Sequence, residues 1–123
     1  MAKTLLIVDD SGSLRTVVNL SLTRAGYQVV EAGDGQEALE RLKKLDKVHL
    51  IVSDVNMPNM DGIALVKAVK QLPNYKFTPI MMLTTESEQS KKMEGKEAGA
   101  KAWLVKPFQP PILLDAVSKL VLP

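Results

Sequence analysis

The 123-residue chain contains no cysteine and one histidine. Disulfide bonds and thiolate metal sites are therefore excluded, and any chemistry must come from oxygen and nitrogen groups. The lack of cysteine also suits a reducing cytoplasm. With 46% hydrophobic residues, the chain is long enough for one core and too short for two ordinary domains. We therefore expect a single compact domain over residues 1–123.

Long apolar runs and basic tracts are missing as well. Only four apolar residues lie between Thr4 and Asp9, which is too few for a signal-peptide core or a membrane span. The net charge is +2, and no basic run is interleaved with aromatic residues, so composition gives little support to nucleic-acid binding. We expect a soluble, cytoplasmic monomer that binds neither membranes nor nucleic acid.

Short apolar segments of strand length alternate along the chain with segments of helical spacing. The expected strands are Leu5–Val8, Val29–Val30, Leu50–Val52, Ile80–Leu83 and Trp103–Val105. The apolar stripes with helical spacing are Leu14–Ala25, Ala38–Leu42, Leu65–Leu72 and Leu113–Leu120. Ser87–Ala98 has few apolar residues and is expected to form the least stable helix. Strands that are apolar on both faces and alternate with helices predict a parallel α/β sheet built from five βα units.

Polar side chains follow the expected strands at their carboxyl ends. Asp9 and Asp10 follow the first strand, Asp54 the third, Thr84 the fourth and Lys106 the fifth. These ends lie at one edge of a parallel sheet, where ligands bind, so we expect the side chains to converge. Two like charges about 4 Å apart repel by about 4 kcal/mol at an effective dielectric near 20, which a hard cation would relieve. Oxygen ligands without cysteine or a nearby histidine favour Mg²⁺ over zinc.

The same set of groups indicates a reaction. A carboxylate at Asp54 is a potential nucleophile, Lys106 can pair with an anion brought by a substrate, and Thr84 can donate a hydrogen bond to it. A single acid at a strand end is usually a helix cap or a solvated turn residue. Acids, a threonine and a lysine at four strand ends are less simply explained that way, and they suggest phosphoryl transfer to an aspartate.

Four motifs carry a family resemblance, namely LLIVDDS, DVNMPNMDG, MLTTE and AGAKAWLVKPF. In combination they resemble the receiver domain of two-component response regulators, and among them the single-domain, CheY-like chemotaxis type, over essentially residues 4–121. The resemblance implies a flavodoxin-like (βα)5 fold, a doubly wound parallel sheet of five strands in the order 2-1-3-4-5. It also implies one receiver domain without an output domain, and a cis bond before Pro107.

The resemblance assigns roles to the residues at the sheet edge. Asp54 is implied to be the phosphoacceptor, and Lys106 to contact the phosphoryl group. Asp9, Asp10 and Asp54 are implied to hold Mg²⁺ together with the backbone carbonyl of Asn56. The domain would thus assist its own phosphorylation and dephosphorylation without being an enzyme that turns over a separate metabolite.

The resemblance also implies a switch and residues that tune it. Thr84 resembles the switch hydroxyl, and Trp103 stands where the family usually has tyrosine or phenylalanine; we expect this ring to turn inward as Thr84 moves toward the phosphoryl group. Asn56 and Glu86 occupy positions that flank the path of hydrolytic water, and their polarity suggests a short-lived signal. Thr85 replaces a smaller residue, and we expect it to slow phosphoryl donors or attacking water.

Several functions remain open on the sequence alone. The leading hypothesis is a response regulator that is phosphorylated by a chemotaxis-type histidine kinase and then binds the flagellar motor switch protein. A stand-alone phosphorelay intermediate, which would meet a phosphotransfer protein, or a phosphate sink has the same site. A haloacid-dehalogenase-like phosphatase needs a second aspartate where Asn56 stands. A flavodoxin-like carrier of flavin mononucleotide is disfavoured because Asp9 and Asp10 would repel its phosphate.

Overall fold

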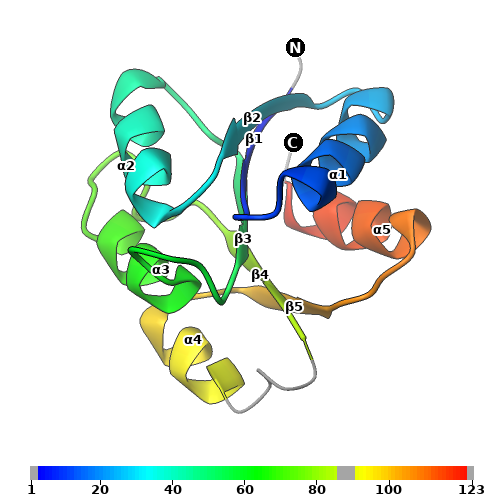
Figure 1. The fold of residues 1–123 in the computed structure, drawn as a ribbon. Helices are drawn as coiled ribbons and strands as arrows, with labels where there is room; N and C mark the ends of the chain where they lie inside the picture. The colour runs from blue at the N-terminus through cyan, green and yellow to red at the C-terminus, as the bar shows by residue number, and fades with distance from the viewer. Residues whose placement is uncertain (1–2, 86–90, 122–123) are drawn as a thin grey trace.

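The computed structural model describes residues 3–85 and 91–121, and the statements below refer to these residues (Figure 1). Strands and helices alternate along the chain. In order they are β1 (Thr4–Val8), α1 (Gly12–Arg24), β2 (Gln28–Ala32), α2 (Gly35–Lys44), β3 (Leu50–Asp54), α3 (Gly62–Lys70), β4 (Ile80–Thr84), α4 (Lys92–Ala98), β5 (Ala102–Val105) and α5 (Pro110–Leu120).

The five strands form one parallel sheet in the order β2-β1-β3-β4-β5. The register pairs Leu5 with Leu50, Ile51 with Ile80 and Met82 with Trp103. Helices α1 and α5 cover one face of the sheet, while α2, α3 and α4 cover the other (Figure 1). This is the parallel sheet that the residue pattern predicted, in the doubly wound, flavodoxin-like order that the resemblance implied.

The core consists of two apolar layers, one on each face of the sheet. Because successive strand residues point to opposite faces, Leu5 and Ile7 pack with α1 and α5, whereas Leu6 and Val8 pack toward α2 and α3. Every residue of β3 and β4 is buried. Strands buried on both faces are typical of parallel sheets, which explains why these segments are apolar throughout.

Capping hydrogen bonds fix the first turns of the helices that follow β1, β2 and β3. The side chains of Ser11, Asp34 and Asp61 accept hydrogen bonds from the backbone at the first turns of α1, α2 and α3. After β3 the chain folds back closely, since a Cβ atom at Gly62 would overlap the backbone oxygen of Asp54. Glycine at this position therefore lets the loop after Asp54 pack against the strand end.

Two helices, α1 and α4, bury only part of their apolar side chains. Val18 and Leu22 of α1 are buried as predicted, but Val17, at the margin of the same stripe, is 54% exposed. Helix α4 has no side-chain hydrogen bond at its first residue and buries only Gly95, as a weak helix would. The first residues of the expected segment Ser87–Ala98 lie outside the described residues. None of the helices in the described ranges has the length and hydropathy that crossing a bilayer requires.

Candidate functional site

Three carboxylates meet at the carboxyl edge of the sheet. One oxygen atom each of Asp9, Asp10 and Asp54 lies within 4.8 Å of the other two. Asp9 is 1% exposed and Asp54 6% exposed, whereas Asp10 is open to solvent. Like charges at this distance repel, so the cluster favours a positive group. The donor set is entirely oxygen, which fits a small hard cation such as Mg²⁺.

Lys106 supplies one positive charge from the end of β5. Its Nζ lies 3.1 Å from Oδ1 of Asp54 and 3.4 Å from Oδ2 of Asp9. Burial alone would lower the pKa of Lys106, but the hydrogen bond and charge of Asp54, followed by those of Asp9, outweigh burial and raise it. The ammonium therefore stays protonated. One ammonium among three carboxylates leaves an excess of negative charge at the site.

The backbone fixes the two strand ends that carry this ion pair. Oδ1 of Asp9 accepts a hydrogen bond from the N–H of Ser11 at 2.8 Å, and the N–H of Asp9 donates to the carbonyl of Ala32 at 3.1 Å. The N–H of Lys106 donates to the carbonyl of Thr84 at 2.6 Å. The peptide bond from Lys106 to Pro107 is cis, as the resemblance implied.

The other residues expected at the site lie at different distances from this cluster. Thr84 ends β4, is 2% exposed and directly follows Leu83, which pairs with Asp54. Asn56 is exposed two residues after β3, while Glu86 lies outside the described residues. The predicted convergence is thus confirmed for the carboxylates and Lys106, with Thr84 at the end of the adjacent strand.

Trp103 lies in β5, away from the carboxylates. Its partly buried ring packs against the apolar layer on the α2, α3 and α4 side of the sheet. A Cβ atom at Gly95 would overlap Cη2 and Cζ2 of this ring, so the indole lies directly against α4. The ring therefore occupies space that a side chain on the helix would otherwise fill.

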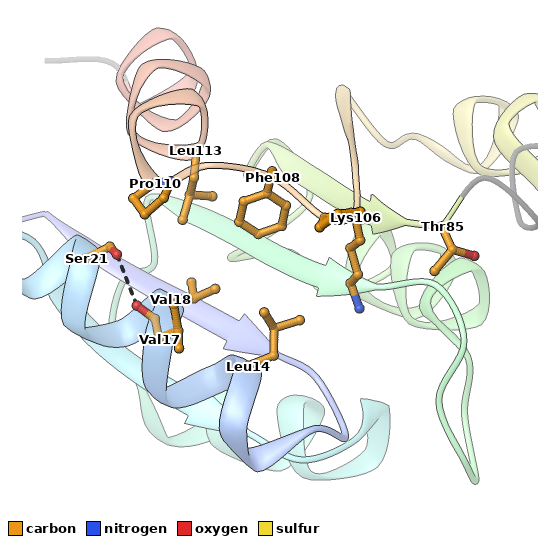
Figure 2. Close-up of a pocket in the computed structure, with 10 residues that line it drawn as sticks. Leu14, Val17, Val18, Ser21, Thr85, Lys106, Phe108, Pro110 and Leu113 are labelled. Atoms are coloured by element: carbon orange, nitrogen blue, oxygen red, sulfur yellow. Dashed lines mark hydrogen bonds between the residues drawn. The ribbon is translucent and has the colours of Figure 1, made fainter.

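An apolar cavity of about 420 Å³ adjoins the site on the side of α1 and α5. Figure 2 shows Val17 and Val18 of α1 on one wall and Phe108 opposite, with Lys106 and Thr85 at one end. Thr85 thus lines the same cavity as Lys106. Val17, which departs from the predicted core, lines this cavity and is exposed.

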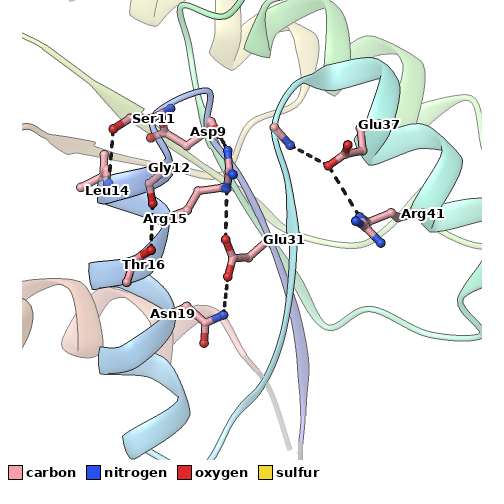
Figure 3. A network of polar contacts seen from close by, with 11 residues as sticks. Asp9, Ser11, Gly12, Leu14, Arg15, Thr16, Asn19, Glu31, Glu37 and Arg41 are labelled. Atoms are coloured by element: carbon pink, nitrogen blue, oxygen red, sulfur yellow. Dashed lines mark hydrogen bonds and ion pairs between the residues drawn. The ribbon is translucent and has the colours of Figure 1, made fainter.

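One residue at the site escaped prediction. Arg15 of α1 donates a hydrogen bond to the backbone carbonyl of Asp9 and pairs with Glu31 of β2 (Figure 3). The available signal was its position, because a cation near a helix N-terminus is unfavourable for the helix dipole and calls for another explanation. Its partners remained hidden, since one is a backbone oxygen and the other belongs to a strand 16 residues away.

Fold and site together define a doubly wound α/β protein with an acidic pocket and a lysine at the carboxyl edge of its sheet. The family model of the response regulator receiver domain matches residues 5–118. The chain is 40% identical over 112 residues to a chemotaxis protein CheY homolog of Campylobacter jejuni, covering 90% of this chain and 86% of that protein. It is 39% identical over 121 residues to the chemotaxis protein CheY of Thermotoga maritima, covering 97% and 98%.

Solved structures agree with this relationship. The chemotaxis response regulator CheY4 of Vibrio cholerae is 50% identical and superposes with a TM-score of 0.92, covering 98% of this chain and 99% of that chain. The chain therefore belongs to the response regulator receiver domain family. It is a two-component signalling protein rather than a classical enzyme. The phosphatase and flavin-carrier alternatives are set aside by this assignment.

Proposed function

We propose that the protein is a chemotaxis response regulator that accepts a phosphoryl group from a histidine kinase on Asp54 and then binds a downstream protein. One observation carries the proposal: Asp54 is nearly buried, yet it lies among two further carboxylates and 3.1 Å from Lys106. The chemotaxis role is supported by relatives of similar length that are chemotaxis proteins.

The residues at the carboxyl edge of the sheet have separate roles in the proposed reaction. A carboxylate oxygen of Asp54 attacks the phosphorus atom, the bond from phosphorus to the donor nitrogen breaks, and the leaving imidazole keeps the electron pair. Lys106, held protonated, neutralises the oxygens of the arriving phosphoryl group. Asp9, Asp10, Asp54 and the backbone carbonyl of Asn56 would hold Mg²⁺, which when bound supplies positive charge to the phosphoryl oxygens.

Thr84 and Trp103 are proposed to report the phosphoryl group to the surface. Thr84 lies buried at the end of the strand next to Asp54, close enough in the sheet to respond to a group added there. Trp103 contacts α4, so movement of its ring would alter the surface formed by α4, β5 and α5. The partner expected at this surface is the flagellar motor switch protein.

Three polar residues are proposed to set the lifetime of the phosphorylated state. They are Asn56 and Thr85 at the approach to the site, and Glu86 outside the described residues. Because Thr85 borders the cavity beside Lys106, its bulk would obstruct phosphoryl donors or water. Comparing phosphorylation and hydrolysis rates of Thr85→Ala with the parent tests this role, and equal rates in both reactions would remove Thr85 from the set.

Substitution of the acceptor tests the proposal directly. Asp54→Ala is expected to abolish the mass gain of one phosphoryl group from a small-molecule donor such as acetyl phosphate, because it lacks the attacking oxygen. Asp61→Ala is a suitable control, since Asp61 caps α3 through its hydrogen bond to Ala64 and lies outside the carboxylate cluster. Full phosphorylation of Asp54→Ala would show that the assigned site is wrong.

The downstream partner requires a separate experiment. The protein is immobilised with and without beryllofluoride and Mg²⁺, which imitate the phosphorylated state, and incubated with purified candidate partners. Binding of a motor switch protein only in the presence of beryllofluoride supports chemotaxis. Binding of a histidine phosphotransfer protein instead supports a relay or a phosphate sink and contradicts the chemotaxis assignment.

A further inference from the structure

Arg15 connects the acidic edge to the edge strand β2. Its Nε lies 3.1 Å from Oε1 of Glu31, and its Nη1 donates to the backbone carbonyl of Asp9 at 2.5 Å. Asn19, one turn further along α1, donates to the second oxygen of Glu31 at 2.6 Å. Both oxygens of Glu31 are therefore bonded to α1, and the carboxylate fixes the orientation of the guanidinium (Figure 3).

The side chain of Arg15 is partly enclosed by its neighbours. Its side chain is 24% exposed and that of Glu31 35% exposed, so the pair is partly shielded from water. Cβ atoms at Gly12 and Gly33 would lie 3.9 Å and 3.4 Å from its Nη2 and Nη1. The guanidinium thus lies between Gly12, the first residue of α1, and Gly33, which follows β2, within contact distance of a side chain at either position.

The bonded carbonyl belongs to the peptide group that joins Asp9 to Asp10. The side chain of Asp9 is held independently by Ser11 and Lys106. Asp10 is exposed, and the described residues make no hydrogen bond or ion pair with its side chain. Its direction therefore depends on how the preceding peptide group is oriented, which is the group that Arg15 holds.

We infer that Arg15, fixed by Glu31, is a positioning residue for the divalent cation: it sets the peptide group between Asp9 and Asp10 so that the Asp10 carboxylate faces the cation. This inference rests on the proposed function, which places Mg²⁺ at these acids. An electrostatic role makes the opposite prediction, because a nearby guanidinium repels a cation and its removal would tighten binding. A purely structural ion pair would change stability and leave cation affinity unaltered.

Variants that keep the charge separate these roles. Arg15→Lys and Glu31→Asp preserve every charge but lose the geometry that joins Glu31 to the Asp9 carbonyl. Binding is measured with Mn²⁺ by electron paramagnetic resonance and with Mg²⁺ by competition. We expect both variants to raise the dissociation constant about tenfold, as for other residues that orient metal ligands. Arg15→Gln is also expected to bind more weakly, although it removes a repelling charge.

A control and a rate measurement complete the test. Arg24→Lys makes the same substitution at the other end of α1 and is expected to bind like the parent. With acetyl phosphate, the Mg²⁺ concentration for half-maximal phosphorylation should rise by the same factor in Arg15→Lys, while the rate at saturating Mg²⁺ stays at the parental value. Circular dichroism verifies folding, and Glu31→Asp carries the test if Arg15→Lys does not fold.

Two sets of outcomes contradict different claims. Parental affinity in the folded charge-preserving variants, or tighter binding by Arg15→Gln, would overturn the positioning role and leave the proposed function intact. A parent protein that is phosphorylated on Asp54 without any divalent cation would overturn the metal site and this inference with it. Weaker binding confined to Arg15 and Glu31 variants supports the inference.

Discussion

The Lys106 ammonium contacts Asp54 and Asp9 at the place where a phosphoryl group on Asp54 would arrive. We expect Lys106→Ala to fold and still accept a phosphoryl mimic, but to lose the conformational response, because no ammonium remains at the end of β5 to draw the mimic toward that strand. Removing the ammonium takes one charged partner from each of Asp54 and Asp9, at a cost of about 1–2 kcal/mol in this partly solvated pocket.

Trp103 fluorescence measures this response. In the parent, adding Mg²⁺ with beryllofluoride should change the emission intensity or its quenching, whereas Lys106→Ala should show no change. Lys101→Ala is the matched control, because Lys101 is exposed just before the opposite end of β5. A parental fluorescence change in Lys106→Ala would contradict the role of the lysine, and an unresponsive parent would contradict switching by Trp103.

Individual site residues were predictable to different degrees. Asp9, Asp54 and Lys106 could be assigned to one site because each ends a strand and parallel strands share their carboxyl edge. Arg15 could not, since its bond to Asp9 involves a backbone carbonyl, an atom that every residue carries. The exposure of Val17 was equally hidden, because the cavity that it lines is formed with residues of α5 that lie far away in the sequence.

In helix α4, Gly95 has a specific packing role. Alanine in place of glycine usually stabilises an exposed helix by about 1 kcal/mol. In α4, however, the added Cβ of Gly95→Ala would overlap the Trp103 ring. We therefore expect a net loss of about 1–2 kcal/mol, typical of overpacking, together with a red shift in tryptophan emission as the ring moves toward water.

Urea unfolding and the emission maximum check this expectation. Gly12→Ala, in the first turn of α1, is the control because its Cβ would have no neighbour closer than 3.9 Å. Its stability should equal that of the parent or exceed it by up to about 1 kcal/mol, because the added Cβ meets no obstacle. A Gly95→Ala protein with parental emission and equal or greater stability would show that the indole does not depend on the space at residue 95.

The elements themselves were largely predictable, with errors where burial is incomplete. Strands β1, β3 and β4 have apolar residues on both faces and were located within two residues of their ends. For β2 only Val29 and Val30 were recognised of the five residues from Gln28 to Ala32, because an edge strand is partly exposed and carries polar side chains. The expected end of α4 at Ala98 agrees with the structure, while the first residues of that expected segment lie outside the described ranges.

Across the whole molecule, the carboxylates lie at the carboxyl ends of the strands, and Lys3 and Lys47 lie near the single histidine at the amino ends. His49 directly precedes β3, and its Nδ1 accepts a hydrogen bond from the N–H of Thr4 at 3.0 Å. Its pKa is lowered below the ordinary value of 6.5 by burial first, and then by the charges of Lys3 and Lys47. This indicates a structural role for His49, at the opposite end of β3 from Asp54.

The lowered pKa makes global stability depend on pH. The unfolded chain binds a proton at His49 near pH 6.5, whereas the folded protein binds it only at lower pH. The contribution is therefore fully present above the unfolded pKa and is lost as pH falls through and below it. We expect the free energy of unfolding to decrease from pH 7.5 to 5.5, and His49→Asn, whose amide oxygen can accept the Thr4 bond without titrating, to reduce this slope. Because the chain has one histidine, the difference between the two urea-unfolding series isolates that residue. Parallel pH profiles would show that His49 has the same pKa in the folded and unfolded chains.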